Sequence, residues 1–345
     1  MKERFLLVLG FASLVTGIAA GLARSGLEPV PVSDDAVLLH GALMVSGFFG
    51  SVISLERAVA FGRLWGYAAP LACGLGGIAL VSGAPRTGLW LMAAGSLVLA
   101  AASVLLTRRQ SSLESWTLAG GAGCWLAGNG AVALGAPLAA AVPWWLAFFA
   151  LTIGAERLEL SRYLARPKVA KWLFIGIVLL LSASTVLSWK ITGISLAALA
   201  LWLFAWDIAR KTVQGRGLAR YIALCLLAGY AWLALGGALL AMGKGYDAPL
   251  HAILVGFVFS MVFGHAPVIV PAVLRVALPY SRWMYLPLAL LHASLALRVA
   301  GGLVGEPAWR VAGSAGNALA IAAFIVTAAL ICIKARRRPP ASLAA

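Results

Sequence analysis

Residues 248–275 read APLHAILVGFVFSMVFGHAPVIVPAVLR, a stretch whose first fully charged side chain is Arg275. An α-helix needs about 20 consecutive apolar residues to cross the ~30 Å hydrocarbon core of a bilayer, so this stretch is long enough to span one. Segments of similar length and hydropathy cover 4–24, 36–57, 63–83, 86–107, 114–135, 138–162, 170–189, 191–211, 217–242, 281–303 and 307–334. We therefore predict an all-α polytopic membrane protein with about twelve transmembrane helices. Strands are not expected, because an open sheet edge cannot be satisfied in lipid.

The composition of the whole chain agrees with this class. Of its 345 residues 62% are hydrophobic and only 11% are charged, whereas an ordinary soluble domain carries about 25% charged residues. A soluble globular protein, a disordered chain and a secreted disulfide scaffold are therefore excluded. The net charge of +16 does not indicate a nucleic-acid partner, because the basic residues lie between the apolar stretches. We expect one transmembrane domain over 1–338, in contact with the lipid bilayer, and a disordered tail over 339–345.

The positions of Lys and Arg predict the orientation of the chain. If the N-terminus is cytoplasmic, most of the 27 basic residues fall on the cytoplasmic side, as the positive-inside rule requires. The exceptions, on the outer side, are Arg24, Arg86, Lys190, Lys244, Arg298 and Arg310. Both termini are therefore predicted to be cytoplasmic.

Similar motifs recur along the chain at a spacing of about four helices. The second span ends in Ile53-Ser-Leu-Glu56-Arg57 and the sixth in Ile153-Gly-Ala-Glu156-Arg157. Basic and aromatic residues follow the second, sixth and tenth spans before the next helix begins. This pattern predicts three repeats of four helices, about 1–110, 111–213 and 214–338, in a pseudo-threefold bundle.

All four histidines of the chain lie inside predicted spans, where ionisable groups are costly and often functional. His40 and His251 lie at a similar depth, about 5–6 Å below the outer ends of the second and tenth spans. Two imidazoles at one level can hold a haem iron from opposite faces, with the apolar bundle as the porphyrin pocket. The alternative is that both are interfacial histidines hydrogen-bonded to loop carbonyls.

The two other histidines lie deeper. His265 follows His251 by about 40° short of four full helical turns, so we expect the two to face the same interior cavity at two depths. His292 lies near the middle of the eleventh span and could form a third wall. Each is a candidate ligand of copper or of a second haem, and the alternative is a hydrogen bond between helices.

Three acidic residues lie near the cytoplasmic ends of spans. Glu56 and Glu156 are each followed by Arg, and they form either a proton entry point beneath the cavity or interfacial caps and ion pairs. Asp207 is expected to pair with Arg210 or Lys211 on its own helix.

Two motifs carry a resemblance to a known family. They are His251-Ala-Ile-Leu-Val-Gly256, continuing to Gly264-His265, and His40-Gly-Ala-Leu-Met44, followed by Gly47-Phe-Phe-Gly50. With the twelve spans around them, they resemble the NnrS family of haem- and copper-containing membrane proteins, which are associated with the bacterial response to nitric oxide. More distantly, the chain resembles the catalytic subunit of haem–copper oxidases and nitric oxide reductases, in which histidines of the second and tenth helices hold a low-spin haem.

The resemblance implies haem b on His40 and His251, with copper or a second haem near His265 and His292, in the inner membrane of a bacterium. Such a protein would bind, sense or relay electrons to a small gas such as nitric oxide. If it is an enzyme, it is a haem-dependent oxidoreductase acting on nitric oxide. The sixth and seventh spans contain no histidine, so an oxidase-type binuclear centre is not expected.

The main alternative belongs to another class: a permease for a small molecule or a metal, without a redox cofactor. Transporters more often show a two-part inverted repeat with broken helices at the midplane, which argues mildly against it. The sequence does not determine the electron donor or the oligomeric state.

Overall fold

The computed structural model describes residues 2–27, 30–162, 164 and 166–337, so the tail predicted at 339–345 lies outside the described residues. Every regular element in these ranges is helical. The long uninterrupted helices are α1 (Lys2–Arg24), α5 (Ala68–Val81), α6 (Pro85–Arg109), α7 (Leu113–Ala133), α8 (Leu138–Leu160), α9 (Lys168–Leu187), α10 (Trp189–Trp206), α12 (Gly217–Ala241), α15 (Tyr285–Val304) and α16 (Pro307–Arg337).

The prediction of a multi-pass membrane protein is supported by the length and hydropathy of these elements. Within the described ranges, 11 helical segments are long and apolar enough to cross a membrane. The predicted fifth span corresponds to α7, which is 21 residues long but does not reach this hydropathy, because glycines, Glu114 and Asn129 dilute its apolar residues. The orientation of the chain and its threefold repeat stay predictions.

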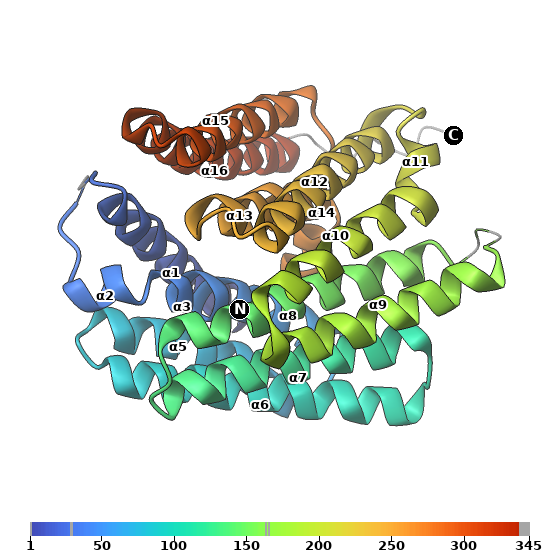
Figure 1. The fold of residues 1–345 in the computed structure, drawn as a ribbon, viewed down its shortest axis with the longest axis horizontal. Coiled ribbons are helices and arrows are strands. Elements are labelled where there is room, and N and C mark those ends of the chain that lie inside the picture. Colours follow the sequence, from blue (N-terminus) through green and yellow to red (C-terminus); the bar gives the residue numbers. More distant parts are fainter. Residues whose placement is uncertain (1, 28–29, 163, 165, 338–345) are drawn as a thin grey trace.

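The helices form one bundle in which neighbours along the chain often pack side by side (Figure 1). The pairs α5–α6, α7–α8, α10–α12 and α15–α16 pack most extensively. Small residues permit the closest crossings: a Cβ atom on Gly193 of α10 would lie 2.5 Å from the carbonyl oxygen of Gly237 on α12. Close backbone approach at small residues is a common way for helices to associate in lipid.

The second and tenth spans are built differently from the others, because each contains a π-helix. The second runs through α2 (Asp34–Leu38), α3 (His40–Ala42), the π-helix η1 (Leu43–Phe49) and α4 (Gly50–Phe61). The tenth runs through α13 (Asp247–His251), the π-helix η3 (Ala252–Phe259) and α14 (Ser260–Leu274). π-Helices are rare and concentrate at functional sites. The sixth span, α8, is α-helical throughout.

A buried polar network fixes η1 against the neighbouring helices. The Asn129 side-chain oxygen accepts hydrogen bonds from the Ser46 hydroxyl (2.7 Å) and the Trp145 indole (3.0 Å). The Trp125 indole in turn donates to the Ser46 oxygen at 3.1 Å. All four residues are buried.

The predicted pairing of Asp207 within its own helix is wrong. Its carboxylate instead accepts two hydrogen bonds from Arg157 of α8, at 2.8 and 3.1 Å. It also caps the short helix α11 (Ala209–Thr212), because the Ala209 amide donates to it at 2.6 Å. The span predicted at 191–211 therefore breaks after Trp206.

Candidate functional site

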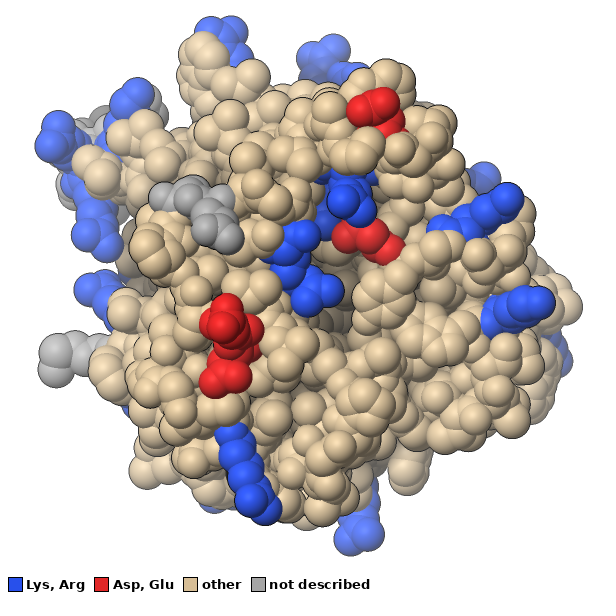
Figure 2. All heavy atoms as spheres, turned by 60° about the vertical axis from the view of Figure 1, so that its left-hand side comes forward, with Lys and Arg blue, Asp and Glu red and all other residues tan. Residues whose placement is uncertain are grey.

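A cavity of about 580 Å³ lies at the end of the bundle where α1 ends and α16 begins. We call this end the mouth. Figure 2 shows the mouth face, where acidic and basic side chains surround a hollow. The lining comes from α1, the second span, α8, the tenth span, α15 and α16. The volume falls within the range of about 300–1,000 Å³ that is typical of cofactor and small-ligand sites.

His40 lines this cavity from α3. Its Nδ1 atom lies 2.7 Å from the carbonyl oxygen of Gly17 on α1. A carbonyl oxygen can only accept, so Nδ1 carries the proton and Nε2 of the neutral ring keeps its lone pair. The ring packs tightly against α1, since a Cβ atom on Gly21 would be 2.7 Å from the His40 Cε1 atom.

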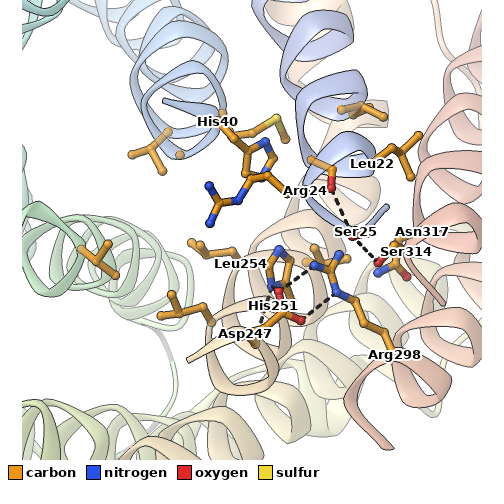
Figure 3. Close-up of a pocket in the computed structure, with 18 of the residues that line it drawn as sticks. Leu22, Arg24, Ser25, His40, Asp247, His251, Leu254, Arg298, Ser314 and Asn317 are labelled. Carbon is orange, nitrogen blue, oxygen red and sulfur yellow. Dashed lines mark hydrogen bonds and ion pairs between the residues drawn. The ribbon is translucent and has the colours of Figure 1, made fainter. Parts of the chain in front are cut away.

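His251 lines the same cavity from α13. Its Nδ1 atom lies 2.9 Å from the Asp247 carbonyl oxygen and 3.1 Å from the Asp247 Oδ1 atom. The Asp247 carboxylate is itself held by Arg298, whose Nη2 and Nε atoms donate to it at 2.9 and 3.2 Å. Figure 3 shows His40 and His251 on opposite sides of one space, with this ion pair beside His251.

Each of these histidines stands immediately before or close to a π-helix, and the two π-helices meet below them. His251 directly precedes η3, and three residues from His40 the chain enters η1. The rings of Phe49 and Phe259, at the ends of η1 and η3, are 5.1 Å apart between centroids and both line the cavity. The two predicted ligands therefore share an apolar chamber with an aromatic floor.

The wall of the cavity carries more positive than negative charge. Arg24, Arg298 and Arg310 line it, and Asp247 is the one carboxylate among the lining residues. Asp247 is paired with Arg298, whereas the guanidinium groups of Arg24 and Arg310 form no ion pair within the described ranges. Partial burial raises the pKa of the neighbouring Tyr246 phenol, which stays a neutral donor at pH 7.

Sequence reasoning did not assign these arginines to the site, although a signal for them was present. Arg24, Arg298 and Arg310 are among the few basic residues that lie on the side predicted to be outer. A basic residue on the outer side departs from the positive-inside rule and so requires another explanation. These three arginines line a cavity, which is such an explanation.

The remaining walls are mainly apolar, with two buried polar exceptions on α16. Representative apolar wall residues are Ile18, Leu22, Leu138, Val142, Leu146, Leu254 and Ile321. The first exception is Ser314, whose hydroxyl donates to the Arg310 carbonyl oxygen at 2.8 Å. The second is Asn317, whose side-chain oxygen accepts a hydrogen bond from Ser294 at 2.7 Å while its nitrogen has no partner in the described structure.

His265 and His292 do not line this cavity. The Nδ1 atom of His265 donates to the Met261 carbonyl oxygen at 2.7 Å, and its Nε2 atom is buried without a partner. The Nδ1 atom of His292 accepts a hydrogen bond from the Trp232 indole at 2.9 Å, which leaves the proton of a neutral ring on its buried Nε2. The expected alignment of His265 with His251 assumed a regular α-helix, and η3 lies between them. A π-helix turns less per residue, so the phase is lost.

The glutamates lie away from the cavity, at the opposite ends of the second and sixth spans. Glu156 forms an ion pair with Arg57, and Glu56 lies within electrostatic range of Glu156. His265 is also within electrostatic range of Glu156. Over the described part of the chain, no three His, Cys, Asp or Glu side chains are grouped closely enough to hold a metal ion.

Comparison with known proteins gives a family without an assigned activity. Searches of curated proteins and of solved structures return no match. A family described as a domain of unknown function, DUF8744, matches residues 4–333, which is nearly the whole chain. No named family, NnrS included, is matched. On this evidence the chain belongs to the DUF8744 family.

Proposed function

We propose that this protein is an integral membrane b-type haem protein in which His40 and His251 bind the iron from opposite sides. One observation carries the proposal: both imidazoles line one apolar cavity, and each donates its Nδ1 proton to a backbone carbonyl. This hydrogen bond fixes the ring orientation and leaves the Nε2 lone pair for a metal, as is usual for metal-binding histidines. The chemistry of the donor set therefore fits a haem with two imidazole ligands.

The charge of the mouth supports the same cofactor. Haem b carries two carboxylate side chains, and the cavity offers two guanidinium groups, Arg24 and Arg310, that are not committed to another charge. Arginine binds carboxylates in a planar, two-pronged geometry. The apolar walls would exclude water from the ring, and the arginines would hold its carboxylates at the mouth.

Bound in this way, the haem would supply one-electron redox chemistry. With His40 and His251 both bound to the iron, the site would be suited to relay electrons. In line with the resemblance to NnrS proteins, we propose that it serves a response to a small gas such as nitric oxide. We further propose that the membrane is the inner membrane of a bacterium and that the mouth faces outward.

We also propose that copper or a second haem binds near His265 and His292. His265 suits a metal, because its free Nε2 carries the lone pair. His292 suits it less, because the bond from Trp232 leaves Nε2 protonated in the neutral ring. Any copper on His265 would need ligands other than a cluster of His, Cys, Asp or Glu side chains within the described structure.

A proton entry at Glu56 and Glu156 is the remaining part of the proposal. Its support is that Glu56 and His265 each lie within electrostatic range of Glu156. The Arg57–Glu156 ion pair is equally what an interfacial cap would show.

The test is an absorption spectrum of the purified protein, oxidised and reduced, combined with iron and copper analysis. We expect a low-spin haem b spectrum with at least one haem per chain, and loss or conversion of its low-spin component in both His40→Ala and His251→Ala. His292→Ala is the matched control, because it removes an imidazole outside the cavity and should leave the spectrum unchanged. A folded protein without haem, or an unaltered low-spin spectrum in both cavity variants, would refute the proposal.

One observation supports the permease alternative: the guanidinium groups of Arg24 and Arg310 line the cavity without an ion pair in the described structure, so they could equally bind a small organic anion. It predicts a haem-free protein that moves a small anion across proteoliposome membranes and loses this transport in Arg24→Gln. The metal analysis above separates the two functions.

A further inference from the structure

We infer that the two proposed axial ligands are unequal: a small neutral ligand such as carbon monoxide or nitric oxide displaces His40, while His251 stays bound. This inference rests on the proposed function. It says which coordination position on the iron the gas would take, because a haem with two permanent protein ligands has no free position.

The restraint on His251 is a chain of contacts that ends in a buried cation. The Nδ1 proton of His251 faces both the carbonyl and the carboxylate oxygens of Asp247, at 2.9 and 3.1 Å. Arg298, which is buried, clamps that carboxylate with two hydrogen bonds. A carboxylate behind an imidazole raises its basicity and strengthens its bond to a metal. His251 is therefore the stronger ligand.

The restraint on His40 is a single hydrogen bond to the neutral carbonyl oxygen of Gly17. Among the residues the structure describes, no carboxylate lies behind this ring as Asp247 does behind His251. A carbonyl is a weaker hydrogen-bond acceptor than a carboxylate, so it raises the basicity of the His40 imidazole less. His40 is therefore the weaker ligand.

The helix is irregular on both sides of His40, whereas His251 borders a π-helix on one side only. The helix is interrupted at Leu39, whose φ and ψ angles are −97° and 21°, and the π-helix η1 begins at Leu43. His40 thus lies in an α-helical piece of three residues between two irregularities. Local opening is easiest where regular hydrogen bonding is interrupted, so His40 can leave its position at lower cost than His251.

The exchange itself is balanced. The iron would lose its bond to the His40 Nε2 atom and gain one bond to the carbon of carbon monoxide or the nitrogen of nitric oxide. Both are neutral donors. The imidazole keeps its proton on Nδ1, bonded to Gly17, so no proton or electron needs to move.

The first experiment identifies the ligand that stays bound. Carbon monoxide is added to the reduced, haem-loaded protein, and the Fe–CO stretching band is recorded by resonance Raman spectroscopy. We expect the band of His40→Gly to coincide with that of the wild type and the band of His251→Gly to differ. Asp247→Asn should shift the wild-type band, because it changes the hydrogen bond of the ligand that remains opposite the gas.

The second experiment weakens the bond between His40 and the iron without replacing His40. Gly21→Ala places a methyl group 2.7 Å from the His40 Cε1 atom, so the ring must move. Overpacking of this size typically costs enough energy to change an equilibrium about tenfold. Because the displaced ring then competes less well for the iron, we expect the affinity for carbon monoxide to rise by about that factor. Gly123→Ala is the matched control, because its Cβ atom would meet nothing within 4 Å.

The outcomes separate this inference from the function on which it rests. A wild-type protein without a haem spectrum refutes the proposed function. A low-spin haem that takes up no carbon monoxide at saturation, or a wild-type band that matches His251→Gly, overturns the inference and leaves the proposed function standing. Equal affinities for Gly21→Ala and Gly123→Ala also overturn it.

Discussion

Replacement of Arg157 by Met should be among the most destabilising single changes in this protein. The Arg157 side chain is 4% exposed and that of Asp207 is 0% exposed, and two hydrogen bonds of 2.8 and 3.1 Å join them. When the guanidinium is removed, the hydrogen bonds that Asp207 keeps within the described residues are those from the Tyr230 hydroxyl at 3.2 Å and the Ala209 amide at 2.6 Å. An ionised carboxylate left buried in this way typically costs about 3–5 kcal/mol of the free energy of unfolding.

A second substitution tests the reason for that loss. In the Arg157→Met background, Asp207→Asn removes the buried charge, and its amide group can still bond to Tyr230 and Ala209. The double variant should therefore recover at least about half of the lost free energy. Unfolding in mixed micelles, followed by circular dichroism, measures both. Arg210→Met, at an exposed arginine, is the control and should stay within about 0.5 kcal/mol of the wild type. An effect of Arg157→Met below about 1 kcal/mol, or a double variant less stable than the single one, would refute the argument.

Three further predictions follow from the packing and the charge pattern. Gly193→Ala should lower the free energy of unfolding by about 1–3 kcal/mol, because the new methyl group meets the backbone of α12. Gly176→Ala, whose methyl group meets nothing within 4 Å, should leave this free energy unchanged, and equal effects of the two substitutions would contradict the argument. Asn129→Leu should cost about 2–4 kcal/mol, because Ser46 and Trp145 lose their buried acceptor, and an unchanged unfolding midpoint would count against it. Reporter fusions in the loop before α13 should report the outside and those after α6 the cytoplasm, and the reverse pattern would overturn the orientation.

The sequence was a good guide to the helices because a span is defined by length and hydropathy. Its errors occur where polar groups interrupt a helix. The segment predicted at 191–211 is broken because Asp207 bonds to Arg157, 50 residues earlier in the chain, and then caps α11. A partner so distant in sequence leaves no local pattern, and the nearby Arg210 offered a plausible substitute.

The candidate site was predictable in part for the same reason. Depth along a helix follows from residue counts, and His40 and His251 do line one cavity. The direction in which a side chain points around the helix axis does not follow from residue counts here, because the α-helical angle per residue does not apply across a π-helix. His265 therefore lies outside the cavity. The ion pair that holds Asp247 behind His251 was not predicted either, because Arg298 reaches it from another helix, α15.

The surplus of positive charge at the mouth also has a kinetic consequence. Arg24 and Arg310 are exposed there, while the carboxylate of Asp247 is neutralised by Arg298. A charged opening with low-dielectric walls concentrates ions of the opposite sign and can raise their association rates by factors of 10 to 10³. The field extends only about 8 Å at physiological ionic strength. We therefore expect dicarboxylic molecules to associate with this opening faster in dilute buffer than in concentrated salt. The entry rate of a neutral gas should not depend on salt, and metal cations should be repelled.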